Sequence, residues 1–377
     1  MSGAGASMVP MTPASRHRSI VPPYLLARLA EADPERLPRA VAAARSHLAS
    51  DDLTRAFRLA SEPVEVQRTA RELHATADLP EGPARAVTDA HGTETLPGAL
   101  VRSETDGPNA DIAVNEAFDG LGATYALFQS VYGRASIDGA GLPLDATVHY
   151  GEDYDNAFWN GDRMVFGDGD GEVFGRFTAS VSVIGHELTH GVTQFTANLD
   201  YEGQSGALNE SVSDVFGALV EQYAADQTVD EASWLIGAGL FTAAVQGRAL
   251  RSLKAPGTAY DDDVLGTDPQ PATMAGYVTE AADNGGVHTN SGIPNHAFYL
   301  VAAALGGRAW ERAGWIWYDT LTAGAIRSSV DFAGFASATA EAAARRFGAA
   351  SAEVTAVAEA WSAVGVPITG GTTGAAA

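Results

Sequence analysis

Two histidines four residues apart carry the most informative chemistry in this sequence. His186 and His190 lie within residues 183–195, a segment without proline whose apolar residues recur near helical spacing. On a helix, side chains at i and i+4 project from one face, so the two imidazoles can share one Zn²⁺ ion. Glu187 is turned roughly 100° away. That position suits a general base acting on water at the metal better than it suits a third ligand.

A third ligand is available 20 residues further along the chain. Glu210 follows His190 at that distance, and Asp214 lies four residues beyond it on the same helical face. A catalytic zinc takes three protein ligands and keeps one position open. We therefore predict that His186, His190 and Glu210 bind the metal, while Asp214 accepts the free N–H of a ligand histidine. The first motif alone would equally suit a surface helix with two histidines; the second segment favours the metal.

Composition excludes several other classes of protein. The 377 residues include no cysteine, which rules out disulfides, thiolate metal sites and cysteine nucleophiles. A net charge of −24 disfavours binding to nucleic acid or to an anionic membrane. The longest apolar run, residues 297–306, is far shorter than the roughly 20 residues of a membrane span. The N-terminus lacks the apolar core of a signal peptide, so these features alone favour the cytoplasm and leave unconventional export open.

Charge divides the chain into two parts. Residues 1–92 carry 11 basic and 11 acidic side chains, so the whole negative charge falls on the remainder. This neutral leader is rich in Ala and Arg and broken by prolines, and we expect it to be helical. Such a leader can dock on an acidic body. Composition alone gives better support to the alternative of an ordinary helical cap or a flexible tail.

The remainder mixes short strands with long helices, which indicates an α+β fold. Hydrophobic periodicity predicts a helix over residues 115–132 and short strands at residues 147–150 and 164–166, with Gly/Asp turns between them. Further amphipathic helices are expected at residues 207–225, 292–306, 309–323 and 333–347. There is no internal repeat.

Four segments together resemble the thermolysin family of gluzincin zinc metalloendopeptidases. They are HELTH at residues 186–190, NAFWNG at 156–161, QSGALNE at 204–210 with Asp214 beyond it, and DNGGVHTNSG at 283–292. The resemblance extends from about residue 95 to residue 363. The early IVPPYLL at residues 20–26 is similar to the short N-terminal propeptide of the protealysin-like branch of that family.

The resemblance implies a two-lobe architecture. A β-rich N-terminal lobe and a mainly α-helical C-terminal lobe would enclose the zinc cleft between them. The expected division is a propeptide over residues 1–70, with a limit defined only to within tens of residues, an N-terminal lobe over 71–200, a helical lobe over 201–369 and a flexible tail over 370–377. The leader would act as an intramolecular inhibitor of a precursor.

The resemblance also implies roles for individual residues. His288 and Tyr201 would donate hydrogen bonds to the developing oxyanion, and Asp283 would orient His288. Asn156 and the carbonyl of Ala157 would hold the substrate backbone.

On the substrate side, Arg251 would bind a substrate carbonyl. An apolar wall would surround the side chain after the cleaved bond, which predicts cleavage before bulky hydrophobic residues: Phe174, Phe177, Val183, Ile236, Leu240 and Leu250. The alternative for these six is that they are simply core residues.

The leading interpretation is therefore a zinc-dependent endopeptidase, monomeric, acting on proteins or peptides, with Glu187 moving the proton of the attacking water to the leaving amine. A catalytically silent peptide-binding protein of the same fold would require the loss of Glu187 or of a ligand, and none is lost. A zinc aminopeptidase would need an acidic anchor for the substrate amine, and none is identifiable. Homologous enzymes are typically exported, which favours secretion of the folded precursor by a non-classical route.

Two features depart from the family pattern. Calcium binding is doubtful because Ser182 and Ala238 replace expected acidic ligands, although Glu221 remains. Other carboxylates offer the alternative of a substitute site: Asp226, Asp230 and Glu231. The leader has no cysteine to cap zinc, so inhibition must be steric or use another ligand, such as His17.

Overall fold

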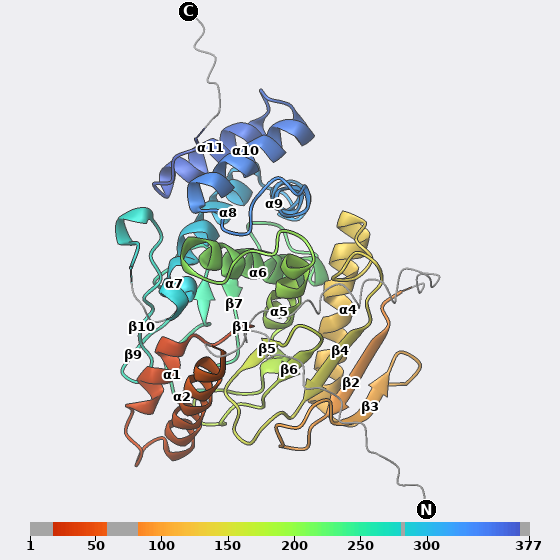
Figure 1. Cartoon of the computed structure of the whole chain (residues 1–377), viewed down its shortest axis with the longest axis vertical. Coiled ribbons are helices and arrows are strands. Elements are labelled where there is room, and N and C mark those ends of the chain that lie inside the picture. The colour runs from red at the N-terminus through yellow and green to blue at the C-terminus, as the bar shows by residue number, and fades with distance from the viewer. Residues whose placement is uncertain (1–17, 59–81, 280–282, 370–377) are drawn as a thin grey trace, which may run out of the picture.

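The computed structural model describes residues 18–58, 82–279 and 283–369 (Figure 1). A mixed β-sheet with one long helix across it forms one half of the molecule, and a group of helices forms the other. Two helices, α5 and α6, lie between these halves. The fold is the α+β, two-lobe arrangement predicted from the sequence. His17 and residues 370–377, on which two expectations fall, lie outside the described residues.

Six strands form the main sheet in the order β1-β5-β6-β4-β2-β3. Their bounds are β1 Arg18–Ser19, β2 Arg85–Asp89, β3 Ala99–Ser103, β4 Leu144–Val148, β5 Ala157–Trp159 and β6 Met164–Phe166. β4 pairs in parallel with β2 and β6, and the remaining pairs are antiparallel. Two small ribbons pair β7 (Leu235–Ile236) with β8 (Arg251–Ser252) and β9 (Asp261–Asp262) with β10 (Gly266–Thr267). The strand predicted at residues 147–150 thus begins earlier and ends at residue 148.

Helix α4, Ile112–Tyr132, packs against this sheet. It begins three residues before the predicted position because the side chain of Asp111 accepts the N–H of Ala113 and caps the helix. It ends at Gly133, whose φ of 65° is the left-handed conformation that glycine adopts at helix ends.

The two central helices are α5, Val181–Gln194, and α6, Gly203–Ala224. Both are buried on nearly all sides, and they touch at the backbone. A Cβ atom at Gly217 would lie only 2.5 Å from the carbonyl oxygen of Ser182 and 3.0 Å from the nitrogen of His186. Glycine at this position therefore lets α6 approach the segment of α5 that carries the predicted metal ligands.

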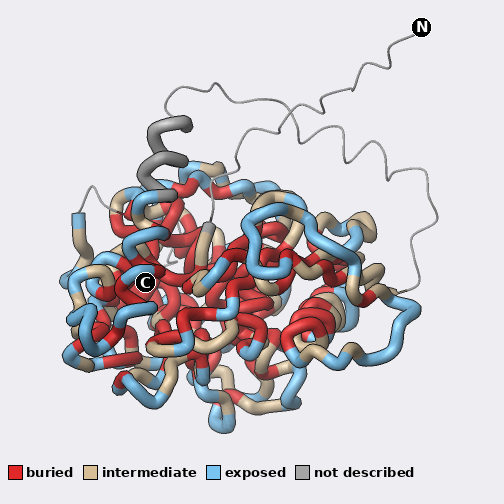
Figure 2. Tube along the Cα trace, turned by 90° about the horizontal axis from the view of Figure 1, so that it is seen from below, coloured by how far each residue is buried: buried red, intermediate tan, exposed pale blue. Residues whose placement is uncertain are grey.

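Five helices complete the C-terminal half: α7 Asp283–Asn290, α8 Gly292–Leu305, α9 Ala313–Thr322, α10 Phe332–Phe347 and α11 Ala352–Ala363. The predictions at residues 292–306, 309–323 and 333–347 are confirmed within four residues, whereas α11 was not predicted. Short 3₁₀ turns lie at Phe177–Ala179 and Met274–Gly276. Figure 2 shows buried residues running through the interior of the molecule. None of the described helices is both long and apolar enough to cross a membrane.

The leader forms α1, Pro23–Ala30, and α2, Pro38–Arg58, and it is docked on the body beside β9 and β10 (Figure 1). Each helix begins at a proline, whose fixed φ suits the first turn. The apolar face of α1 is buried: Leu25, Leu26 and Leu29. Around it, Arg36 pairs with Asp263 at 2.7 Å, and Arg39 pairs with Asp153. The neutral leader therefore contacts the acidic body through both apolar packing and ion pairs.

Candidate active site

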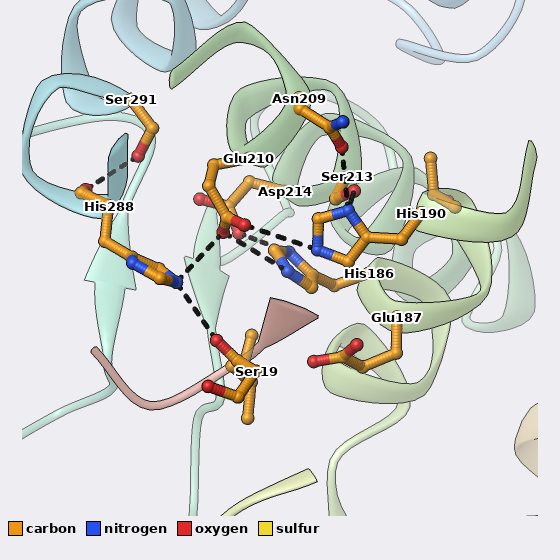
Figure 3. Close-up of polar contacts among 12 residues, drawn as sticks. Ser19, His186, Glu187, His190, Asn209, Glu210, Ser213, Asp214, His288 and Ser291 are labelled. Carbon is orange, nitrogen blue, oxygen red and sulfur yellow. Dashed lines mark hydrogen bonds and ion pairs between the residues drawn. The ribbon is translucent and has the colours of Figure 1, made fainter. Parts of the chain in front are cut away.

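Helices α5 and α6 bring the three predicted metal ligands together. His186 and His190 project from α5, Glu210 from α6, and all three are fully buried. The Nε2 atom of His186 lies 3.5 Å from one carboxylate oxygen of Glu210, and that of His190 lies 3.4 Å from the other. Their candidate ligand atoms all lie within 4.8 Å of one another. Figure 3 shows the two rings and the carboxylate pointing toward a common space.

The second nitrogen of each ring fixes its orientation. His186 donates from Nδ1 to Asp214 at 2.8 Å, as the spacing of Glu210 and Asp214 predicted. His190 donates from Nδ1 to the side-chain oxygen of Asn209 at 2.8 Å, and the hydroxyl of Ser213 lies 3.0 Å from the same atom. These contacts leave Nε2 of each ring as the metal-facing nitrogen. The partners of His190 were not predicted, although Asn209 and Ser213 have the i, i+4 spacing of one helical face.

The residues present fit Zn²⁺. Two neutral imidazoles and a carboxylate are the ligand set of a catalytic zinc site with an open position. Nε2 of His186 and one oxygen of Glu210 are buried without a hydrogen-bond partner, as expected for metal ligands. Burial opposes the charge of Glu210, but the nearby positive charge of His288 holds its pKa well below the ordinary value. The site is therefore built to keep this carboxylate ionised.

Asp214 connects the metal ligands to the wall of the cleft. Its carboxylate accepts two hydrogen bonds from Arg251 and one from Asn295, each at 2.8 Å, besides that from His186. Burial alone would raise the pKa of Asp214, but the guanidinium of Arg251 and the hydrogen bond from His186 lower it to about 2. Arg251 and Asp214 are thus a fully buried, bidentate ion pair.

The leader occupies the space beside this site as an added β-strand. β1 pairs antiparallel with β5 at the edge of the sheet. The N–H of Ile20 donates to the carbonyl of Ala157 at 3.1 Å, and the carbonyl of Ser19 lies 3.0 Å from Nε2 of His288 (Figure 3). The peptide bond between Ser19 and Ile20 therefore lies between two residues that the sequence assigned to substrate binding and catalysis.

The next two leader residues are held by the other predicted substrate-binding groups. The third nitrogen of Arg251 donates to the carbonyl of Ile20 at 2.9 Å. The side-chain oxygen of Asn156 accepts the N–H of Val21 at 3.0 Å. The three residues expected to bind substrate backbone, and His288 beside them, thus bind leader backbone.

A left-handed turn presents His288. Asn284, Gly285 and Gly286 all have positive φ, a run that the two glycines adopt without strain. The carboxylate of Asp283 accepts both the backbone N–H of His288, at 2.9 Å, and its ring Nδ1–H, at 2.6 Å. Burial lowers the pKa of His288, but the charges of Asp283 and Glu210 outweigh it and raise the pKa to about 9. The ring is therefore a cationic donor at neutral pH.

Tyr201 and Glu187 are the remaining two residues to which the sequence assigned catalytic roles. The hydroxyl of Tyr201 donates to Glu210 and lies 3.4 Å from Nε2 of His288. Glu187 is fully buried, and one of its carboxylate oxygens accepts the backbone N–H of Trp159 at 2.9 Å. Figure 3 shows this carboxylate on the side of the triad nearest Ser19. Of these residues, His288 contacts the leader directly, at the carbonyl of Ser19, and Tyr201 contacts both His288 and Glu210.

The six residues of the predicted apolar wall are all at most 2 % exposed. Leu250 donates its backbone N–H to Ile236 at 2.9 Å and directly precedes Arg251. A Cβ atom at Gly237 would lie within 3.0 Å of both Leu240 and Leu250. The rings of Phe174 and Phe177 have centroids 5.6 Å apart. Burial alone is compatible with both a pocket wall and a core.

Ser182 and Ala238 occupy the positions where the family pattern suggested acidic calcium ligands. The hydroxyl of Ser182 accepts the N–H of Gly237 at 3.3 Å, and Glu221 accepts a hydrogen bond from Ser233 at 3.2 Å. Burial raises the pKa of Glu221. Asp226, one of the alternative ligands, instead pairs with Arg308 at 2.7 Å. Within the described residues, the zinc triad is the only group of three His, Cys, Asp or Glu side chains close enough to hold an ion.

A buried His₂Glu set on two helices, a glutamate beside it and a sheet edge that binds extended backbone define a zinc metallopeptidase. Two family models match this chain: the thermolysin metallopeptidase catalytic domain over residues 59–194 and its alpha-helical domain over residues 197–366. The chain belongs to the thermolysin family and is a zinc metalloendopeptidase.

Several known proteins are similar to it. An extracellular metalloprotease of Pectobacterium carotovorum is 53% identical over 77% of this chain and 83% of its own length. Protease PrtS of a Photorhabdus strain is 50% identical over 68% and 69% of the two chains. The solved precursor of protealysin, a metalloproteinase from Serratia proteamaculans, matches with a TM-score of 0.82 and 49% identity, covering 93% of this chain and 99% of that one. This agrees with the protealysin-like branch indicated by the leader.

Proposed function

We propose that this protein is the latent precursor of an exported endopeptidase that cleaves before bulky hydrophobic residues. The observation that carries the proposal is the leader strand. Ser19, Ile20 and Val21 are bound through their backbone by the residues assigned to substrate, in one continuous run. A segment bound in this way excludes substrate from the same positions. Inhibition is then steric, and no leader cysteine is required.

The chain's own residues have separable roles in peptide hydrolysis. His186, His190 and Glu210 would hold Zn²⁺, which when bound supplies Lewis-acid polarisation and makes water acidic enough to attack at neutral pH. Glu187 takes the proton of the attacking water and returns it to the leaving amine. His288 and Tyr201 donate to the oxygen on which negative charge develops.

The same geometry favours an endopeptidase over an aminopeptidase. The leader continues on both sides of the Ser19–Ile20 bond: Arg18 pairs with Trp159 on one side, and Val21 binds Asn156 on the other. An aminopeptidase site would close on a free amine beside the scissile bond. A silent peptide-binding protein is disfavoured because Glu187 and the three ligands are all in place.

Specificity is proposed from the position of Ile20. Its side chain is fully buried, and its carbonyl is bound by Arg251, the neighbour of Leu250 in the apolar wall. The residue that follows the cleaved bond in a substrate would take this place. A large apolar side chain there gains about 1.5–3 kcal/mol from burial, so hydrophobic residues should be preferred.

The limits of the parts and the location of the enzyme are also proposals. Residues 1–70 would form the propeptide, 71–200 and 201–369 the two lobes, and 370–377 a tail. In support, α2 of the docked leader ends at residue 58 and the first body strand begins at residue 85. Relatives named as extracellular support export of this chain. The non-classical route is proposed from the sequence features of the N-terminus. We propose that it acts as a monomer on proteins and peptides, not on nucleic acid.

Replacing Glu187 tests the mechanism directly. Wild type and Glu187→Gln are compared for zinc content and for cleavage of a peptide library, after the leader has been removed. Zinc should be retained and cleavage lost, because the base is removed and the ligands are not. Glu202→Gln, the same change at an exposed position, is the matched control. Undiminished cleavage by Glu187→Gln would contradict the proposed mechanism. A library preference for Asp or Lys after the cleaved bond would contradict the proposed specificity, and full activity of the untrimmed chain would contradict its latency.

A further inference from the structure

Two fully buried aspartates lie on the far side of the segment that binds Val21. Asp155 directly precedes Asn156, which accepts the N–H of Val21. Asp170 lies in the Gly/Asp turn that leads to Phe174 of the apolar wall. Both carboxyl groups have 0 % exposure. Neither aspartate contacts the metal ligands, and the mechanism above gives neither a role.

The two aspartates connect the backbone-binding segment to the wall. Asp155 accepts the N–H of Asp170 at 2.7 Å. On either side, Gly169 donates to the carbonyl of Tyr154 at 3.2 Å, and Gly167 donates to the carbonyl of Asn156 at 3.0 Å. The connection between these segments is therefore continuous across residues 154–156.

Asp170 continues this connection into the wall. One of its carboxylate oxygens accepts three backbone N–H groups, those of Glu172 and Val173 at 2.6 Å and that of Phe174 at 3.2 Å. The position of Phe174 thus depends on Asp170, and the position of Asp170 depends on Asp155.

Each of these two carboxyl groups has a second oxygen, and the surroundings of these oxygens determine how the pair is protonated. Both oxygens are buried, and no N–H group of the described residues donates to either. The two carboxyl groups lie within hydrogen-bonding reach of each other and away from water, so both cannot be ionised and the pair shares one proton. We assign the proton to Asp155, because its carboxyl group accepts one N–H whereas that of Asp170 already accepts three.

The surroundings favour the same assignment. Burial raises the pKa of Asp155 well above its ordinary value, and the charge of Asp170 and their mutual hydrogen bond raise it further. Of the other charged groups nearby, Asp153 raises this pKa again. Arg39, from the leader, lies near both Asp170 and Glu172. Arg39 departs with the leader, so the mature enzyme retains only the acidic neighbours.

We propose that Asp155 is a positioning residue whose protonated carboxyl group donates to Asp170 and so holds Asn156 and Phe174 in place for the substrate residues after the cleaved bond. This inference rests on the proposed function, because it assigns Asn156 and Phe174 to substrate. Asp155 acts through these two residues and does not itself touch substrate.

Two substitutions at Asp155 separate this role from general stability. Asp155→Ala removes the link, and we expect KM for peptides to rise about tenfold, the effect of losing about one buried hydrogen bond, with a smaller change in kcat. Asp155→Asn should rescue KM, because an amide accepts from the N–H of Asp170 and donates to its carboxylate. Asp162→Ala, at a side chain that is 81% exposed in a nearby turn, should leave KM unchanged.

The proton itself can be observed independently of activity. Infrared difference spectra of full-length zinc-loaded wild type against Asp155→Asn, at neutral pH, should show a protonated carboxyl band that is lost in the variant. The variant should also gain thermal stability relative to wild type as the pH rises above about 4. The raised pKa makes the folded wild type retain a proton that the unfolded chain releases, and the variant lacks this cost.

Distinct outcomes would overturn the two proposals. Absence of the protonated carboxyl band would contradict the role of Asp155. So would an Asp155→Asn variant whose KM is raised as much as that of Asp155→Ala. Neither result would contradict the proposed peptidase function. A wild type that cleaves no peptide contradicts the proposed function instead. If Asp155→Ala does not fold, the infrared comparison with Asp155→Asn decides the question.

Discussion

Docking of the leader should weaken in acid because of one buried histidine. His47, on α2, is 9 % exposed, and its ring centroid lies 4.0 Å from that of Tyr154 on the body, edge to face. Burial lowers the pKa of His47 from 6.5 to about 4. An undocked leader would expose the ring and restore the ordinary value. The contribution of His47 to docking is therefore fully present above about pH 6.5 and is progressively lost as the pH falls toward 4.

The magnitude follows from the two pKa values. A difference of about 2.5 is equivalent to about 3 kcal/mol of docking free energy once the pH is below both values. At pH 5 the loss is already about 2 kcal/mol, or about 30-fold in the docking equilibrium. This is large for a contact made by one side chain, and it should be measurable well before the protein unfolds.

Hydrogen exchange of the α1 and α2 amides measures this opening. The sample is full-length zinc-loaded Glu187→Gln, which cannot trim itself, between pH 7 and pH 5, with intrinsic exchange rates corrected. His47→Gln in the same background loses some packing but cannot gain a proton, so its protection should be lower and independent of pH. His91→Gln, at a body side chain that is 68% exposed, should behave like the parent. Unchanged leader protection between pH 7 and 5, or an equal pH dependence in His47→Gln, would refute the reasoning.

Two further predictions concern the supports of the metal centre. Asp214→Asn leaves the guanidinium of Arg251 buried without its counter-charge, so the free energy of unfolding, measured in urea, should fall by about 3–5 kcal/mol. Zinc affinity, measured by competition with a chelator, should fall about 10–100-fold. Losses far below these would show that the carboxylate is dispensable. Calcium in excess over saturating zinc should raise the melting temperature by no more than a few degrees, since Glu221 is hydrogen-bonded to the hydroxyls of Ser182 and Ser233 rather than grouped with further carboxylates among the described residues. A rise of many degrees would reveal a calcium site.

The metal ligands could be predicted because their geometry is local. His186 and His190, and likewise Glu210 and Asp214, are i and i+4 on single helices, and helical periodicity fixes their relative directions. The partners that complete the site depend on packing over long distances. Asn295 reaches Asp214 across 81 residues of sequence, and nothing in its own segment indicates this contact.

The leader shows a second limit of sequence reasoning. Its composition favoured a cap or tail, because neutral, Ala-rich, proline-broken segments carry no strand pattern. The two-residue strand β1 forms only because β5 offers an unpaired edge. The pairing of Asp155 with Asp170 could not be predicted for a related reason. In the sequence each is only an acidic residue near a turn, and both become buried only when the sheet folds.

The place of β1 in the sheet has a consequence for which proteins this enzyme can cut. The edge of β5 accepts three consecutive residues only in an extended conformation, through main-chain groups that every polypeptide possesses. A helix or an internal strand of a target has already committed those groups to its own hydrogen bonds. Its local unfolding free energy is therefore added to the barrier for cleavage. The enzyme should act as a sensor of local order, sparing compact proteins and digesting loops, frayed ends and damaged chains at rates set more by the target's stability than by its sequence.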